Sequence, residues 1–180
     1  MWQSQKEPTP KEAGFHKCGD KRCNTCKLGT FGTTIPITST NKTFVIRNPI
    51  SCKSANVIYC VTCKRCREQY IGETEQEIHE RQRGHLSDIS NNKQGLPYVT
   101  HFQKCGIEHY TITGVERIRK NCTDTRKGRE RYYKKLFDVK IKWKIFLLSK
   151  ILAFRVAFSK LGTGCIQPFH DVETNGLVNS

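Results

Sequence analysis

Acidic residues and long apolar runs are scarce in this chain of 180 residues. A membrane-spanning helix needs roughly 18 or more apolar residues in a row. The most apolar stretch, 145–158, does not qualify because Lys150 and Arg155 interrupt it. The first 14 residues are polar and lack the apolar core of a secretory signal. We therefore expect an intracellular protein, nuclear or cytoplasmic, that does not span a membrane.

The shortage of acidic residues leaves a strongly basic chain. Asp and Glu number 16 against 31 Lys and Arg, so the formal net charge is +15. A surplus of this size attracts polyanions, of which nucleic acid is the commonest. We expect DNA as the partner; a membrane surface, or a basic protein with no polyanion partner, is the alternative.

Ten cysteines is a high number for a chain without an export signal. The thiols are then expected to stay reduced, and clustered cysteines indicate metal ligands rather than disulfides. A C-x4-C-x2-C pattern with a distant fourth thiol predicts a tetrahedral Zn²⁺ site at Cys18, Cys23, Cys26 and Cys52. His16 or Cys60 is an alternative fourth ligand, and buried free thiols are the alternative to a metal.

Composition divides the chain into four parts. A polar tail (1–14) precedes a cysteine-rich extension (15–53) whose Thr- and Gly-rich middle predicts a strand pair. A third part (54–138) alternates apolar and helical patterns, and a basic apolar tail (139–180) follows. The last part reads as an insertion before a closing turn at Asn175-Gly176-Leu177, or as a tail without an evolved role.

The third part predicts an α+β domain. Strands over 54–62 and 67–73 are followed by a helix over 74–90, which Thr74 and Glu77 are expected to start as a capping box. A short helix over 98–104, a strand over 109–118 and a helix over 124–137 capped by Asp124 complete it. This order predicts a small central antiparallel sheet flanked by helices.

Five residues of this part have side chains suited to phosphodiester chemistry: Tyr59, Tyr70, Arg81, His85 and Glu130. Each also has an ordinary explanation. The tyrosines can be strand aromatics, and the arginine and histidine, four residues apart, can belong to a solvated helical face. The glutamate can form an ion pair with Arg126 or Lys134 on its own helix.

The ordered set carries a resemblance to a known family. Ile58-Tyr59, ten intervening residues, Tyr70-Ile71-Gly72, then Arg81, His85 and Glu130 resemble the GIY-YIG nuclease domain. The string NVIYCVTCKRCREQYIGET is most similar to the endonuclease domain of Penelope-like retroelements, whose hallmark is cysteines between the two tyrosine motifs. The likeness covers roughly residues 15–137. It departs from the family where Asn56-Val57 replaces the first glycine.

The resemblance implies a metal-dependent endonuclease that nicks DNA. Glu130 would bind one Mg²⁺ or Mn²⁺ through carboxylate oxygen, and Arg81 would hold phosphate oxygens with its planar fork of donors. Tyr59 would be the general base, or would orient the water, if the metal and Arg81 lower its pKa. Tyr70 would bind the water or the phosphate, and His85 would relay the proton or ligate a metal.

The resemblance also implies a second, structural zinc site. Two cysteines between the tyrosine motifs would combine with downstream residues, which on this chain gives Cys63 and Cys66 with His101 and either His109 or Cys105. Four protein ligands leave no open position for chemistry at such a metal.

Basic residues around these motifs are expected to contact DNA phosphates without reading sequence: Lys64, Arg65, Arg67, Arg83, Arg126 and Arg129. The resemblance further implies that the nick primes a reverse transcriptase, which another chain would have to supply. The alternative function is a catalytically inactive, zinc-stabilised DNA-binding module. A redox role for the C-x2-C pairs is disfavoured because neither pair opens a helix in a βαβ setting.

Overall fold

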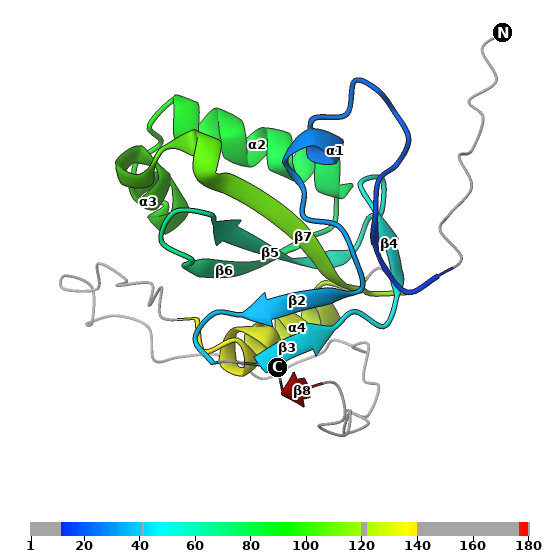
Figure 1. Ribbon diagram of the computed structural model, residues 1–180. Helices are drawn as coiled ribbons and strands as arrows, with labels where there is room; N and C mark the ends of the chain where they lie inside the picture. The colour runs from blue at the N-terminus through cyan, green and yellow to red at the C-terminus, as the bar shows by residue number, and fades with distance from the viewer. Residues whose placement is uncertain (1–11, 41, 120–121, 140–176, 180) are drawn as a thin grey trace, which may run out of the picture.

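A computed structural model describes residues 12–40, 42–119, 122–139 and 177–179 (Figure 1). Its described part contains four α-helices and three small sheets, which confirms the α+β class. The order of elements from the first to the last strand of the central sheet also matches the predicted order. None of the helices described is both long and apolar enough to cross a membrane.

The central sheet has three antiparallel strands in the order β6-β5-β7. These are β5 (Val57–Cys63), β6 (Gln69–Thr74) and β7 (Tyr110–Arg117). The middle strand reads VIYCVTC, and six of its seven residues are buried. It lacks the alternation of a half-exposed strand because both faces of the sheet are covered.

Helices cover both faces of this sheet. In the view of Figure 1, α2 (Ile78–Ser90) and α3 (Pro97–Cys105) lie above it, and α4 (Thr123–Leu136) lies below it together with β2 and β3. The predicted inward residues Tyr133 and Phe137 are buried at the end of α4. Each helix thus places an apolar stripe against the sheet, as its spacing predicts.

The predicted capping box at the start of α2 is wrong. Thr74 is the last residue of β6, and its hydroxyl bonds to the carbonyl of Gln76. The helix begins at Ile78, and its first amides donate to backbone carbonyls: Ile78 to Ser54 at 3.1 Å and His79 to Cys52 at 3.0 Å. The loop after β4 therefore satisfies the amides that a side chain would otherwise have capped. Likewise, Asp124 does not cap α4, which follows Cys122.

The cysteine-rich extension folds around two small sheets. β1 (Gly14–His16) pairs in parallel with β4 (Pro49–Ser51), and the short helix α1 (Asn24–Leu28) lies between them in sequence. The predicted strand pair is confirmed as the antiparallel β2 (Thr34–Ile37) and β3 (Lys42–Val45).

The extension packs directly against the central sheet. The amide of Thr30 donates to the carbonyl of Ile112 at 3.1 Å, and the Thr113 hydroxyl donates to the carbonyl of Thr30 at the same distance. Phe15 and Ile50 lie so close to Gly114 of β7 that a Cβ at Gly114 would approach Ile50 to 2.6 Å. Buried residues of both parts form one hydrophobic core, which spans the predicted boundary at 53/54.

The two predicted tails fall mostly outside the described residues. Of the polar tail, Gly14 already belongs to β1, so the extension begins one residue earlier than predicted. Of the C-terminal part, residues 140–176, with the predicted insertion and the start of the closing turn, lie outside. Leu177–Asn179 forms strand β8, which adds to β3 in antiparallel register.

Candidate active site and metal sites

Tyr59 lies at the centre of the candidate active site. It sits in the middle strand β5, fully buried, and its hydroxyl lies 2.9 Å from Nε2 of His85. Nε of Arg81 donates a hydrogen bond to the same hydroxyl at 3.1 Å. Arg81 and His85 are one helical turn apart on α2, so both reach the sheet from the same side of that helix.

A glycine on the neighbouring strand makes room for this phenol. Tyr59 is paired with Gly72 of β6, and a Cβ at Gly72 would meet the Tyr59 oxygen at 2.5 Å. The ring of Tyr59 therefore lies across the glycine of the Tyr70-Ile71-Gly72 motif. Any larger residue there would push the hydroxyl away from Arg81 and His85.

His85 is held as a neutral imidazole. It is fully buried, and its ring stacks on Tyr98 with the centroids 4.3 Å apart. Burial, together with the nearby Arg81 charge, lowers its pKa to about 3. In the tautomer with the imidazole hydrogen on Nδ1, the Tyr59 hydroxyl donates to Nε2 of His85 while it accepts from Arg81. The Nδ1 atom, which then carries the imidazole hydrogen, has no hydrogen-bond partner within the described residues.

Burial works against ionisation of the two motif tyrosines. It raises the pKa of Tyr59 to about 12, although the Arg81 charge acts in the opposite direction. The expected lowering of this pKa is therefore not present in the protein without metal. Burial also raises the pKa of Tyr70, whose ring centroid lies 6.3 Å from that of His85. All three rings thus meet under α2.

Glu130 approaches the same site from α4. Its negative charge contributes to the raised pKa values of both Tyr59 and Tyr70, so the carboxylate lies within electrostatic range of both phenols. Its Oε1 also forms an ion pair with Nζ of Lys134 at 2.9 Å, as the ordinary explanation predicts. Tyr59, Tyr70, Arg81 and His85 therefore meet on one face of the sheet, whereas Glu130 is linked to the two phenols through its charge and not by a direct contact.

Glu130 suits Mg²⁺ or Mn²⁺ by donor type. A small hard cation prefers carboxylate oxygen and keeps several waters, so one carboxylate can anchor it. A cation at Glu130 would compete with the ammonium of Lys134, which pairs with Oε1 of that carboxylate. Within the described residues, the groups that converge as metal ligands are two cysteine-rich clusters instead.

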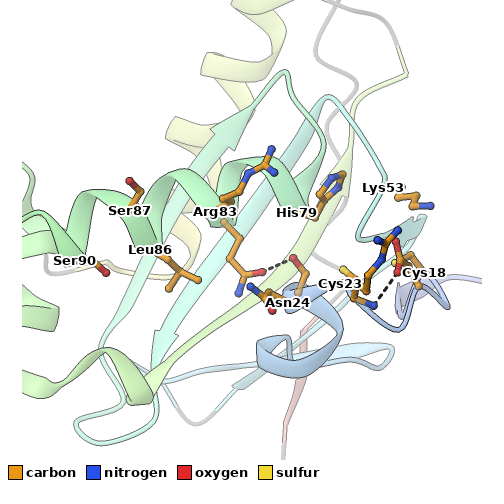
Figure 2. Close-up of a pocket in the computed structure, with 13 residues that line it drawn as sticks. Cys18, Cys23, Asn24, Lys53, His79, Arg83, Leu86, Ser87 and Ser90 are labelled. Atoms are coloured by element: carbon orange, nitrogen blue, oxygen red, sulfur yellow. Dashed lines mark hydrogen bonds between the residues drawn. The ribbon is translucent and has the colours of Figure 1, made fainter.

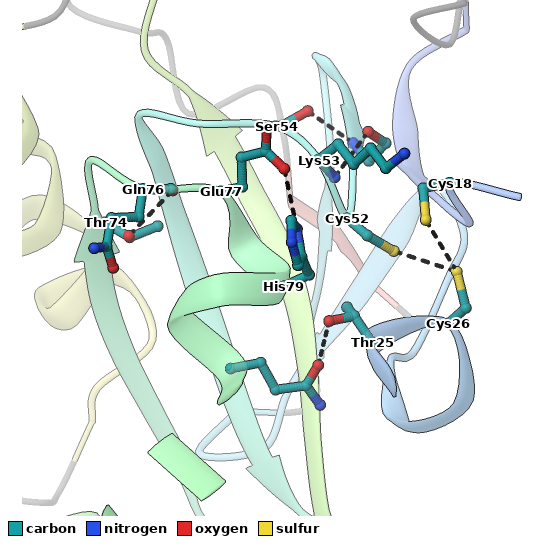
Figure 3. A network of polar contacts seen from close by, with 12 residues as sticks. Cys18, Thr25, Cys26, Cys52, Lys53, Ser54, Thr74, Gln76, Glu77 and His79 are labelled. Carbon is teal, nitrogen blue, oxygen red and sulfur yellow. Dashed lines mark hydrogen bonds and ion pairs between the residues drawn. The ribbon is translucent and has the colours of Figure 1, made fainter. Parts of the chain in front are cut away.

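The first cluster is the predicted set Cys18, Cys23, Cys26 and Cys52. The sulfur atoms of Cys18 and Cys52 each lie 3.5 Å from that of Cys26 (Figure 3). Zinc with Zn–S bonds of about 2.3 Å requires tetrahedral S···S edges of about 3.8 Å. These thiols can therefore hold Zn²⁺ after small adjustments. His16 and Cys60, the alternative ligands, bond elsewhere, to the Glu12 carbonyl and to Thr62.

The second cluster joins the turn after β5 to α3. It contains Cys63, Cys66, His101 and Cys105, with Cys66 Sγ 3.5 Å from Nε2 of His101. Nδ1 of His101 lies 3.1 Å from the Glu68 carboxylate, which leaves Nε2 for a metal. A carboxylate that orients a ligating histidine in this way is typical of zinc sites. This cluster can also hold zinc.

The structure favours one alternative at each of two positions that the prediction left open. Cys105 takes the fourth position, whereas the imidazole of His109 lies 3.4 Å from Glu108 outside the cluster. His109 ends the turn that follows α3, while Cys105 still lies on that helix, four residues after His101. His85 is not a ligand because its ring bonds to Tyr59.

The thiol of Cys63 in this cluster ionises more readily than an ordinary cysteine. Burial alone would raise the pKa of Cys63, but hydrogen bonds from the Cys66 amide and from His101 outweigh it and lower the pKa to about 7. Zinc binds the thiolate rather than the thiol. The lowered pKa therefore favours a metal at this position at neutral pH.

The residues predicted to contact DNA separate into two groups. Lys64, Arg65 and Arg67 are exposed in the turn between β5 and β6, and Arg83 is exposed on α2. Their charged groups are placed to meet a polyanion.

Arg126 is buried and Arg129 is partly buried. Arg126 is 2% exposed and donates to Glu73, Asn56 and Glu75 at 2.9–3.1 Å. Arg129 donates two hydrogen bonds to Glu116, at 2.7 and 3.2 Å. Carboxylates of the core strands and their flanking loop already engage these two guanidinium groups, which argues against the predicted phosphate contacts.

Comparison of the chain with protein-family models, curated proteins and solved structures found no match in any of the three. Site residues that sequence reasoning missed are Gly72, Tyr98 and Glu68. Gly72 is the last residue of the Tyr70-Ile71-Gly72 motif, and its role follows from its pairing with Tyr59 on the neighbouring strand. The other two stand in no recognisable spacing, since each acts on a histidine distant in sequence.

Proposed function

We propose that the chain is a metal-dependent endonuclease that nicks DNA, with Tyr59, Tyr70, Arg81, His85 and Glu130 as its active-site residues. The observation that carries the proposal is the Tyr59 hydroxyl, which is hydrogen-bonded by Arg81 on one side and by a neutral His85 on the other. An ordinary strand tyrosine needs neither partner.

The arrangement supports a proton path. The phenolic oxygen receives a hydrogen bond from a cation. In the tautomer with the imidazole hydrogen on Nδ1, the phenolic proton points to the unprotonated Nε2 of His85. When a water attacks a phosphodiester, Tyr59 takes the proton of that water and passes its own to His85. The high pKa of Tyr59 requires that the two transfers are concerted, so that no free phenolate forms.

Arg81 supplies the contact to phosphate. It uses Nε for Tyr59, and its two terminal nitrogens have no hydrogen-bond or ion-pair partner among the residues described. Burial lowers the pKa of this guanidinium, but the surrounding tyrosines raise it by more, so the pKa is raised and the group stays charged. Two free donors on a charged, half-buried fork match a phosphoryl group.

Glu130 is the residue that would hold the divalent cation. When bound, Mg²⁺ or Mn²⁺ neutralises charge on the phosphoryl oxygens and on the departing 3′-oxygen. Zinc in the two cysteine clusters would fix the extension and the β5–β6 turn to the core. Through the resemblance, the proposal extends to a nick that primes a reverse transcriptase carried on another chain.

The alternative is an inactive DNA-binding module. It is favoured by the raised pKa of Tyr59, by the low pKa of His85, which makes that imidazole a weak base for the relayed proton, and by the ion pair that occupies Glu130. Under this alternative the basic surface and the zinc sites retain their roles while the phosphodiester is not cleaved.

Plasmid nicking with Mg²⁺ or Mn²⁺ distinguishes the two functions. We expect the zinc-loaded chain to nick supercoiled DNA, and Arg81→Ala or Glu130→Gln to slow the reaction by about 10²–10³-fold. Lys104→Ala and Glu108→Gln, which alter exposed residues of the same charge outside the site, serve as controls. Wild-type protein that binds DNA but shows no metal-dependent nicking would support the inactive module.

A further inference from the structure

A second pocket lies on a different side of α2 from Arg81 and His85. It has a volume of about 420 Å³ and opens between α1 and α2 (Figure 2). One wall is formed by Cys23 and Asn24 at the start of α1. The other follows α2 from His79 to Ser90. Nothing in the proposed cleavage reaction uses this pocket.

The lining of the pocket is rich in cations and hydrogen-bond donors. Arg22, Lys53 and Arg83 contribute positive charge, and Asp20 is the one acidic residue in the lining. The Asp20 carboxylate already accepts the backbone amide of Arg22 at 2.8 Å. Within the part of the chain that the structure describes, the guanidinium groups of Arg22 and Arg83 have no ion-pair partner. The pocket therefore attracts anions.

A buried amide in the lining points to the same kind of ligand. Gln82 is 1% exposed, and its Oε1 accepts a hydrogen bond from the hydroxyl of Thr25. Its Nε2 atom is buried without a hydrogen-bond partner within the described residues. A buried donor without an acceptor is unfavourable, so this amide is suited to a ligand that supplies an oxygen.

We propose that this pocket binds a backbone phosphate of the DNA strand, at a second point beside the cleaved phosphodiester; this assignment rests on the proposed function. Phosphate oxygens are acceptors only, which matches Gln82 Nε2 and Arg83. A zinc ion held by four thiolates would carry net negative charge at the Cys18 end. The phosphate is therefore placed at the end of Arg83, Ser87 and Ser90, which Figure 2 shows farther along α2 from Cys18.

The separation of the two sites suits a single strand. They lie on different sides of one helix, whose diameter with side chains is about 10–12 Å. Successive nucleotides of a DNA strand rise by about 3.4 Å. A strand that passes over α2 can thus reach the second pocket about three nucleotides from the phosphate at Arg81. The pocket also has room for part of the adjoining sugar.

DNA binding by the zinc-loaded full chain, without Mg²⁺ or Mn²⁺, tests the proposal independently of cleavage. Gln82→Glu keeps an acceptor for Thr25 but replaces the donor with a negative charge, and Gln94→Glu makes the same change in an exposed loop. We expect Gln82→Glu to weaken binding of a fluorescent duplex about tenfold, and Gln94→Glu to change it less than twofold. Arg83→Ala should reduce the slope of log affinity against log salt by about 1, while Lys104→Ala leaves it unchanged.

The outcomes separate the possible failures. Wild-type affinity and salt slope in both Gln82→Glu and Arg83→Ala would overturn the pocket assignment, even if nicking is observed. Because Arg83 is exposed, its variant stays informative if Gln82→Glu does not fold. Inorganic phosphate is the second probe. If phosphate raises the melting temperature of wild type and both variants bind DNA as wild type does, the pocket binds a free anion. That result would overturn the contact with the DNA strand. If wild-type protein does not nick DNA, while Gln82→Glu and Arg83→Ala change DNA binding as expected, only the proposed reaction is overturned and the pocket assignment stands.

Discussion

The hydroxyl of Tyr59 lies 2.9 Å from Nε2 of His85, although 26 residues separate them in the chain. A strand of the central sheet supplies the phenol, and the helix above that sheet supplies the imidazole. Both groups of this hydrogen bond are buried. A buried tyrosine–histidine pair beside an arginine is the arrangement from which the proposed reaction follows.

Gly72→Ala should impair nicking more than folding. The new methyl group would meet the Tyr59 oxygen at 2.5 Å and displace the hydroxyl from its two partners. A misplacement of about 1 Å can cost about 10²-fold in rate, and we expect a loss of that size in single-turnover nicking.

Gly84→Ala is the matched control for this change. A Cβ at Gly84 meets nothing within 4 Å, and the position lies inside α2. Alanine there should stabilise the fold by about 1 kcal/mol, because glycine is a poor helix former, and it should leave nicking unchanged. Equal rates in the two alanine variants would contradict the role assigned to Gly72.

Acid should destabilise the protein through His85. Burial lowers its pKa from 6.5 to about 3, so below pH 6.5 the unfolded chain takes up a proton that the folded chain refuses. Stability is therefore lost as the pH falls through this range. Between pH 7 and pH 5 the loss from this one group should be about 2 kcal/mol.

Urea unfolding of wild type and His85→Gln at these two pH values measures the effect. The glutamine variant cannot titrate, so its stability should fall by about 2 kcal/mol less than that of wild type over the same interval. Zinc content is measured in parallel, because thiolate ligands also take up protons. Identical pH dependence in both proteins would show that His85 is not held neutral.

The structure predicts two zinc ions per chain, one for each cysteine cluster. Native mass spectrometry should find one ion fewer in Cys26→Ser and in Cys105→Ser. His109→Ala should keep both ions, since its imidazole pairs with Glu108. Cys60→Ala, which removes a buried thiol outside the clusters, is the control. Loss of zinc from His109→Ala, with retention in Cys105→Ser, would reverse the ligand assignment.

Arg126→Met should reduce stability without reducing DNA affinity. The change leaves Glu73 and Asn56 without their donor inside the fold. Partners left unsatisfied in this way typically cost about 1–3 kcal/mol, and the lower end applies because the carboxylates are partly exposed. Arg131→Met, at an exposed position of the same helix, should stay within about 0.5 kcal/mol of wild type in a denaturant titration. A tenfold loss of DNA affinity in Arg126→Met, at full stability, would restore its role as a phosphate contact.

Strong local patterns in the sequence predict much of the fold. The β-branched run around Tyr59 and the helical spacing of Ile78 and Ile89 predict the strand and the helix that meet at the site. Both signals are local and depend on side chains that the element itself must bury. The C-x2-C spacing of Cys23 and Cys26 predicts the first metal cluster, because these two ligands are also close in sequence.

Other features depend on contacts between segments distant in sequence. Arg126 has the same local pattern as an exposed basic residue, and only the position of Glu73, 53 residues away, makes it internal. The choice of Cys105 over His109 depends on where α3 ends. The start of α2 depends on the carbonyls of Cys52 and Ser54 in the loop after β4, which satisfy amides that the sequence assigns to Thr74. No spacing rule contains this information.

Single-turnover nicking by Tyr59→Phe tests the central claim most directly, because the change removes one oxygen and keeps the buried ring. If this hydroxyl transfers the proton of the attacking water, the rate in Mg²⁺ should fall by about 10²–10⁴-fold, while DNA affinity changes little and the melting temperature falls only by the amount that the lost hydrogen bonds to Arg81 and His85 explain. A rate equal to that of wild type would contradict the proposed reaction at this site.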